Sequence, residues 1–201
     1  MTDARLTLSG LACLRGGRML LAGIDLTLVA GQCAVLRGPN GTGKSSLIRA
    51  VAGLLPVYAG KVVHDGAMAL SDENLAFDLE APLARALRFW AGIDHVGDDA
   101  VDVALTAFGL SRLHDVPVRM LSTGQRKRAV LARVAASGAS IWLLDEPANG
   151  LDSGSIAMLG TVMARHLGEG GIILAASHQP LPLAHPQELD LTRFQPEADA
   201  V

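Results

Sequence analysis

Three short apolar runs, each followed at once by glycine or polar residues, most restrict how this chain can fold. They read CAVL at 33–36, IWLL at 141–144 and IILAA at 172–176. Continuous apolar strands of this length are typical of parallel sheets that helices cover on both faces. Helical patterns follow the first two runs, at 43–53 and from about Ser153. The sequence therefore predicts an α/β fold with a parallel-sheet core.

The segments between these runs predict how the rest of the chain is organised. Apolar and polar residues alternate over 24–31, which indicates a strand with one wet face. Residues 61–70 read as two short strands around a tight Asp-Gly turn, and 188–194 as a weak strand. Between about 75 and 136 the pattern is helical. We expect one domain, 1–201, with this helical part inserted into the sheet core.

The composition narrows the possible classes of function. Lys and Arg number 17 against 20 Asp and Glu, a net charge of −3, which argues against binding nucleic acid by bulk charge. The start lacks the pattern of a secretory signal, and no apolar run approaches the ~18 residues that a spanning helix needs. We therefore expect membrane contact only through a partner. Cys13 and Cys33 form no CxxC pair and fit a reducing compartment.

The segment GPNGTGKS fits the pattern G-x-x-x-x-G-K-[ST] between a predicted buried strand and a predicted helix. Glycines let backbone N–H groups approach a phosphate, and the helix N-terminus adds its positive dipole end. Lys44 can reach the β- and γ-phosphates, and the Ser45 hydroxyl can bind Mg²⁺. The alternative is an ordinary glycine turn that caps a helix, which the flanking elements make less favoured. The predicted nucleotide-binding residues are Gly38, Pro39, Asn40, Gly41, Thr42, Gly43, Lys44, Ser45 and Ser46.

Candidate catalytic groups follow the other two apolar runs. Asp145 ends a predicted strand where its carboxylate can hold Mg²⁺, directly or through water, and Glu146 can polarise the water that attacks the γ-phosphate. A strand that simply ends in a polar turn is the alternative. His178 also follows a strand, where a lone histidine is more often structural than catalytic. Because ligands gather beyond the carboxyl ends of parallel strands, we expect Lys44, Asp145 and His178 to converge.

The order of motifs along the chain carries a family resemblance. A phosphate loop, then LSTGQ, LLDEP, ANGLD and a histidine after a strand resembles the ATP-binding-cassette (ABC) ATPases, and LSTGQ discriminates them from other phosphate-loop proteins. The resemblance covers nearly the whole chain. It implies a P-loop NTPase fold with a parallel-sheet core, an N-terminal antiparallel β-region and an inserted helical subdomain. It also implies ATP hydrolysis, with ATP and Mg²⁺ as cofactors.

The same resemblance implies a head-to-tail dimer with a second ATPase subunit. In such a dimer Ser122 and Gly124, with Gln125 of the same motif, contact ATP held by the other subunit. Asp152 crosses the interface, and His178 lies near the γ-phosphate. Physical reasoning agrees, since a hydroxyl, a glycine and a helix N-terminus make a second anion cradle. One phosphate group does not fit deep into two cradles of one chain.

The basic run that follows this motif has two interpretations. We expect Arg126, Lys127 and Arg128 to form a solvated, weakly paired helix face, in preference to a nucleic-acid contact. A soluble ABC ATPase that acts on nucleic acid or ribosomes is the competing function. Relatives of that kind usually carry two cassettes or long coiled-coil arms, and this sequence has neither.

Two positions depart from the pattern of the family. Its members stack adenine on an aromatic residue, but none precedes Tyr58 here, and Arg15 is expected to stack instead. They also carry a glutamine in the loop that leads to the helical part, where Glu73 or Asn74 stands nearest. These departures leave open a cassette that binds ATP as a clamp without hydrolysing it.

The segment SHQPL at 177–181 resembles the haem-exporter ATPases of cytochrome c biogenesis, the CcmA family. This resemblance implies haem export, or haem release from its chaperone, in c-type cytochrome biogenesis. It implies an integral membrane partner like CcmB, with CcmC and CcmE nearby, at the cytoplasmic face of a bacterial inner membrane. The ATPase of another small ABC transporter is the alternative.

Overall fold

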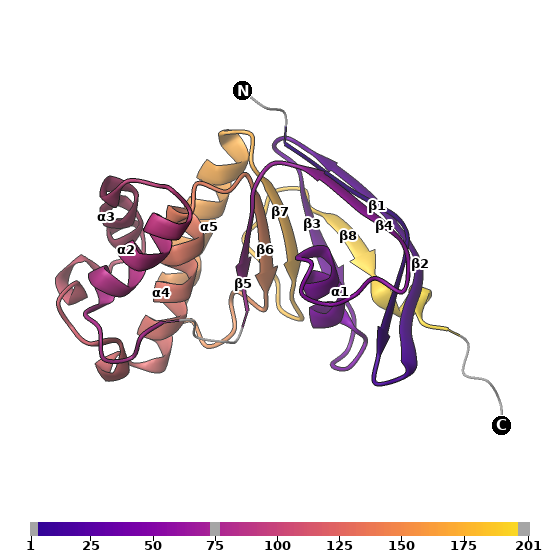
Figure 1. Cartoon of the computed structure of the whole chain (residues 1–201), viewed down its shortest axis with the longest axis horizontal. Coiled ribbons are helices and arrows are strands. Elements are labelled where there is room, and N and C mark those ends of the chain that lie inside the picture. The colour runs from indigo at the N-terminus through magenta and orange to yellow at the C-terminus, as the bar shows by residue number, and fades with distance from the viewer. Residues whose placement is uncertain (1–3, 73–76, 197–201) are drawn as a thin grey trace.

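A computed structural model describes residues 4–72 and 77–196, which form two sheets and a group of helices (Figure 1). The antiparallel sheet has the order β2-β1-β4, from strands Arg18–Val29, Arg5–Arg15 and Ala59–Asp65. The second sheet has the order β5-β6-β7-β3-β8, from Met68–Ser71, Ile141–Asp145, Ile172–Ala176, Cys33–Arg37 and Gln187–Asp190. All its pairings are parallel. The α/β fold with an antiparallel N-terminal region is confirmed.

The three apolar runs form β3, β6 and β7 at the centre of the parallel sheet, as predicted. Side chains of β6 alternate between two apolar clusters. Ile141 and Leu143 pack with α1 (Lys44–Val51), whereas Trp142 and Leu144 pack with α4 (Thr123–Ala136) and α5 (Ser153–Gly168). Every residue of β6 and β7 is buried, because helices cover both faces. The carboxyl ends of these strands are thereby fixed side by side.

The expected pairing of the two short strands in 61–70 is wrong. Both strands exist, but β4 pairs antiparallel with β1 and β5 pairs parallel with β6. Gly66, with φ 116°, lies at the point where the chain leaves one sheet for the other, and a Cβ there would overlap the Ser140 hydroxyl. Local alternation indicates a strand but carries no information about its partner.

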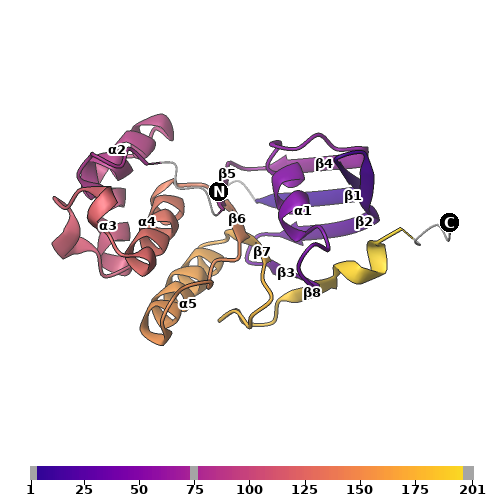
Figure 2. The ribbon, with the colours of Figure 1, turned by 90° about the horizontal axis from the view of Figure 1, so that it is seen from below.

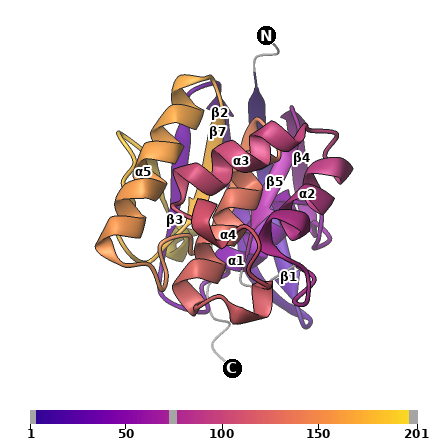
Figure 3. The same ribbon diagram turned by 90° about the vertical axis from the view of Figure 1, so that its left-hand side faces the viewer.

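Helices α2 (Leu83–Ile93), α3 (Asp98–Ala107) and α4 form a group beside the parallel sheet, on the face that α5 also covers (Figure 3). Short 3₁₀ turns, Ser111–Leu113 and Val118–Met120, connect α3 to α4. Apolar residues of all four helices share one core cluster with Trp142 of β6. The helical pattern predicted from about 75 thus begins as regular helix at Leu83.

The last described segment differs from the strand expected over 188–194. Strand β8 ends at Asp190, and Leu191–Phe194 is a 3₁₀ turn in which the Thr192 N–H donates to the Asp190 carboxylate at 3.0 Å. Figure 2 shows β8 beside β3, on the side of the sheet remote from the helical group. Within 4–72 and 77–196, no helix combines the length and apolarity required to cross a membrane.

Candidate active site

The loop between β3 and α1 has the form of a phosphate cradle. It needs glycine at three positions: Gly38 has φ 144°, Gly41 has φ 84°, and Gly43, the residue before α1, has φ 108°. Lys44 is buried, and its Nζ donates to the Gly38 carbonyl at 2.7 Å and to the Pro39 carbonyl at 3.2 Å. The lysine side chain therefore lies back across the loop, with its charge at the first turn of α1.

A carboxylate and an imidazole meet beside this lysine. Glu146 follows β6 with φ 47°, and its N–H donates to the Ala176 carbonyl of β7 at 2.9 Å. Its Oε2 lies 2.9 Å from Nδ1 of His178 and accepts the His178 N–H at 3.3 Å, while Oε1 is 3.9 Å from Nζ of Lys44. A carboxylate oxygen and an imidazole nitrogen at this distance share one hydrogen bond. Three strand ends thus bring three titratable groups together.

These groups line a cavity of about 410 Å³. Its lining residues are Arg15, Leu20, Asn40, Gly41, Gly43, Lys44, Ser45, Ser46, Glu146, Asn149 and His178. Leu20 and Asn149 were not predicted: a leucine gives no chemical signal, and Asn149 lies in the ANGLD motif without an assigned role. Asp145 ends β6 as expected but is 3% exposed and is not among these lining residues.

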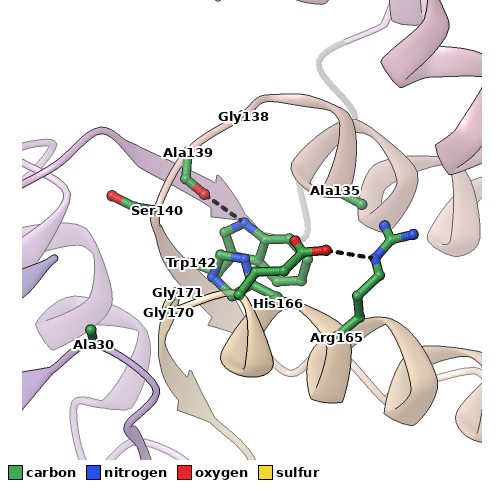
Figure 4. A pocket seen from close by; sticks show the side chains of 11 residues that line it. Ala30, Ala135, Gly138, Ala139, Ser140, Trp142, Arg165, His166, Gly170 and Gly171 are labelled. Atoms are coloured by element: carbon green, nitrogen blue, oxygen red, sulfur yellow. Dashed lines mark hydrogen bonds and ion pairs between the residues drawn. The ribbon is translucent and has the colours of Figure 1, made fainter. Parts of the chain in front are cut away.

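A second cavity, of about 340 Å³, lies at the opposite, amino end of the sheet (Figure 4). The rings of Trp142 and His166 stack there at 3.7 Å between centroids. Trp142 Nε1 donates to the Ala139 carbonyl at 3.1 Å, and His166 Nε2 lies 3.3 Å from the Ile172 carbonyl. Burial lowers the pKa of His166 below its usual range, so the ring is neutral. The ring nitrogens Trp142 Nε1 and His166 Nε2 thus both have backbone carbonyls as partners.

Comparison with known proteins gives the family. The ABC transporter family model matches residues 21–149. The cytochrome c biogenesis ATP-binding export protein CcmA of Sphingopyxis alaskensis is 53% identical over 92% of this chain and 95% of its own length. The CcmA protein of Novosphingobium aromaticivorans is 51% identical over 98% of this chain and all of its own length. The chain belongs to the ABC transporter family, in its CcmA group.

Solved structures agree with this assignment. An ABC transporter ATP-binding protein of Pyrococcus furiosus superimposes with a TM-score of 0.83 at 21% identity, covering 96% of this chain and 100% of its own, which shows the shared fold. CbiO1 of Clostridium perfringens, part of the ABC transporter complex CbiONQ, has a TM-score of 0.71 at 26% identity, covering 88% and 79%. The chain is therefore an ATP-binding and ATP-hydrolysing subunit of an ABC transporter.

The LSTGQ turn of this ABC subunit begins α4 and lies outside the cavity of its own chain. Ser122 caps the helix: its N–H donates to Gln125 Oε1 at 2.8 Å, and its hydroxyl accepts the Gln125 N–H at 3.3 Å. A Cβ built on Gly124 would lie 3.7 Å from the Gly150 carbonyl, so the turn adjoins the ANGLD segment. Of the described residues that line the cavity, none comes from 121–125.

Asp152 of the ANGLD motif begins α5. Its Oδ1 accepts the Ser155 N–H at 2.7 Å, and hydrogen bonds from Ser155 hold the pKa of this exposed carboxyl below its usual range. The carboxylate is therefore ionised at neutral pH. It belongs, with Gly124, to a surface separate from the cavity.

The interpretation of the basic run as a solvated, weakly paired face is wrong. Arg126, Lys127 and Arg128 are half-buried. Arg126 Nη2 donates to the Arg119 carbonyl at 2.7 Å, and Arg128 Nη1 donates to the Phe108 carbonyl at 2.9 Å. These guanidinium groups hold the end of α3 and the turn before LSTGQ against α4, because each satisfies a carbonyl that no helix bond satisfies.

The two departures from the family pattern differ in outcome. Arg15 ends β1, next to a Gly16-Gly17 turn, and lines the cavity beside Leu20, so stacking of Arg15 on adenine stays a prediction. The loop of Glu73 and Asn74 lies outside the described residues.

Proposed function

We propose that the 410 Å³ cavity is the ATP site and that Glu146 is its general base. The observation that carries this proposal is the Glu146 carboxylate lying between Lys44 and His178 at the ends of three parallel strands. Backbone N–H groups of the loop from Gly38 and the Lys44 ammonium would bind the β- and γ-phosphates. Glu146 would then take a proton from the water that attacks the γ-phosphate, and His178 would hold the γ-phosphate in place.

The base of the nucleotide would lie on Arg15 and Leu20. Arg15 is exposed, and its planar guanidinium offers the same kind of stacking face as an aromatic ring. Leu20 adds an apolar edge. This arrangement replaces the aromatic residue that the sequence lacks before Tyr58.

Ser45 and Asp145 would hold Mg²⁺ through a hydroxyl and a carboxylate, the hard oxygen ligands that this ion prefers. Ser45 lines the cavity, and Asp145 ends β6 behind it. No group of three or more His, Cys, Asp or Glu that could hold a metal ion occurs among the described residues. That sparse ligand set fits Mg²⁺, which usually takes its other ligands from water and substrate phosphates. The ion would neutralise charge that develops on the phosphate oxygens.

Two copies of the chain would share each ATP. Ser122, Gly124 and Gln125 form a prebuilt helix N-terminus outside their own cavity, and Asp152 lies on the neighbouring segment. A helix N-terminus with a serine hydroxyl whose O–H can donate suits an anion, and the γ-phosphate of ATP on a second copy would supply it. A head-to-tail dimer satisfies both copies at once.

Mixing two inactive variants tests this arrangement. Lys44→Ala removes the phosphate contact of one site, and Ser122→Arg blocks the turn that would cover the other copy's site. Each variant is expected to be inactive alone, and mixed dimers should regain activity because one of their two sites is intact. Absence of recovery at every mixing ratio would contradict shared sites that work independently.

At the level of the cell, we propose that this ATPase powers haem export, or haem release from a chaperone, in c-type cytochrome biogenesis. The identity with proteins named for cytochrome c biogenesis and export supports this. Its partner would be a CcmB-like membrane subunit, with CcmC and CcmE nearby. The chain would lie peripherally on the cytoplasmic face of a bacterial inner membrane.

A groove beside the helical group supports a membrane partner. A cavity of about 350 Å³ there is lined by Leu54, Leu70, Asp72, Phe77, Trp90, Val130 and Arg133. Leu54 in this lining is 66% exposed, and Phe89, whose ring contacts that of Trp90, is 63% exposed. We take 1–201 as one ATP-binding domain and about 75–136 as the inserted helical subdomain, which lines this groove together with Leu54, Leu70 and Asp72 of the core.

Purification from membranes tests the proposed complex. The tagged full chain should bring down an integral membrane protein, and Phe89→Asp should release that protein while ATP binding is unchanged. Co-purification with ribosomes or salt-sensitive binding to RNA would favour a soluble ABC ATPase instead.

A further inference from the structure

The turn that carries His178 is held by its own backbone and by β3. Ser177 is 1% exposed, and its N–H donates to the Leu36 carbonyl at 3.3 Å. The Ser177 hydroxyl donates to the Gln179 carbonyl at 2.8 Å and accepts the Gln179 N–H at 3.1 Å. His178 therefore sits at the tip of a closed turn, with its ring directed at Glu146.

The side chain of Arg37 also binds this turn. Arg37, the last residue of β3, donates through Nη1 to the Ser177 carbonyl at 3.1 Å and to the Gln179 carbonyl at 2.8 Å. These two carbonyls flank His178 on both sides in the chain. The other edge of the guanidinium donates to Glu188 Oε1, at 3.3 Å from Nε and 3.0 Å from Nη2. Nη1 of Arg37 thus faces the histidine turn, and its Nε and Nη2 face β8.

We propose that Arg37 is a positioning residue that sets where the His178 ring lies relative to the phosphate loop. The inference rests on the proposed role of His178 in ATP hydrolysis. Arg37 immediately precedes Gly38, so one residue fixes both the start of the phosphate loop and the turn opposite it. A planar guanidinium with several fixed donors holds two carbonyls in one geometry better than a single ammonium does. Arg37 itself does not line the cavity, so it acts through His178.

The expected consequence of losing Arg37 is a displaced histidine in an otherwise intact site. Arg37→Met keeps the length of the side chain and removes its donors. A displacement of about 1 Å in a reacting group can lower turnover roughly 100-fold. We expect Arg37→Met to lower kcat by about 10- to 100-fold and to leave KM for ATP within about twofold. The matched control is Glu188→Gln, which weakens the exposed ion pair and keeps both carbonyl bonds, and it should retain wild-type kcat.

A double-mutant comparison separates positioning from general stability. If Arg37 acts through His178, then Arg37→Met should lower kcat no further in a His178→Ala chain. An equal loss in both backgrounds, or a wild-type kcat in Arg37→Met, would overturn the proposal. Ring NMR signals supply a readout independent of turnover: the His178 signal, identified by its loss in His178→Ala, should move in Arg37→Met and stay in Glu188→Gln. An unmoved signal in Arg37→Met also overturns it.

The controls distinguish this proposal from the proposed function. Assays use the full chain in the membrane complex with which it co-purifies. If wild type hydrolyses no ATP there, the proposed function fails, whatever Arg37 does. If wild type and Arg37→Met are equally active, only the role of Arg37 fails.

Discussion

The two ends of the parallel sheet carry cavities of similar size but opposite character. At the carboxyl end, Lys44, Glu146 and His178 line about 410 Å³. Glu146 pairs with His178, and Lys44 lies 3.9 Å from Glu146 while it donates to two carbonyls of its own loop. At the amino end, the about 340 Å³ cavity has a stacked Trp142 and His166 whose ring nitrogens bond to backbone carbonyls. A histidine lines each cavity and the two volumes are similar. Neither the residue types nor the volume therefore indicates which cavity is an active site.

What separates the two ends is where the polar atoms find partners. At the amino end the backbone satisfies the rings, and burial keeps His166 neutral. At the carboxyl end the charged groups are held by turns after the strands, and they can exchange partners when a ligand enters. A site for chemistry therefore needs charged groups whose present partners can be replaced. The predictions below test this difference.

Glu-to-Gln substitutions at the two ends of the parallel sheet should differ most in their effect on kcat. Glu146→Gln is expected to lower kcat for ATP by about 10²–10⁴-fold, because the neutral amide cannot accept a proton from water. Equilibrium binding of a fluorescent ATP analogue should be unchanged. Glu169→Gln, which alters an exposed pair with Arg165 at the amino end, should leave kcat unchanged. Wild-type turnover in Glu146→Gln would remove Glu146 from its proposed role.

Gly171→Ala should lower the free energy of unfolding, because the amino end of the sheet is tightly packed. A Cβ there would overlap the His166 ring, which cannot move away because it is stacked on Trp142. Overpacking of this kind costs about 1–3 kcal/mol of the free energy of unfolding. Urea denaturation measures this loss. Gly168→Ala is the control: it ends α5 with nothing within 4 Å of a new Cβ, and it should be neutral or slightly stabilising.

His166 should make stability depend on pH. Its pKa is lowered in the folded chain, so the unfolded chain binds more protons below its ordinary pKa of about 6.5. The contribution is fully present above about pH 6.5 and is lost as the pH falls toward the folded pKa. Thermal unfolding from pH 7.5 to 5.5 should show a falling Tm in wild type and a flatter profile in His166→Phe. Equal slopes in the two proteins would contradict a neutral, buried His166.

Arg15→Ala should have the smallest effect and should identify what Arg15 binds. Loss of one stacking cation is expected to weaken ATP binding by about 2- to 10-fold. Affinity for inorganic tripolyphosphate should not change if Arg15 contacts only the base. Equal weakening for both ligands would place Arg15 on the phosphates. Arg18→Ala, in the same hairpin but outside the cavity lining, is the control.

The sequence predicted best what depends on local pattern. Strands β3, β6 and β7 and helix α1 were predictable because continuous apolar runs and helical periodicity are visible within a few residues. The pairing of β4 was not, because its partner β1 lies about fifty residues earlier and its neighbour β5 lies next to it in sequence. Local order alone favoured a hairpin that the fold does not form.

The same limit applies to the site. The charged residues of the cavity were predictable, since their chemistry and spacing follow known phosphate-binding logic. The interactions of Arg37, Arg126 and Arg128 were not, because their partners are backbone carbonyls of other segments. Every residue has a backbone carbonyl, so the sequence does not indicate which carbonyl a side chain will bind.

The capping box at Ser122 has a consequence for how two copies would assemble. Its reciprocal bonds with Gln125 already fix the turn in a single chain. Closing this turn over a neighbour's phosphate would therefore require little loss of conformational entropy. Cleavage of that phosphate would weaken the interface without any refolding of the turn.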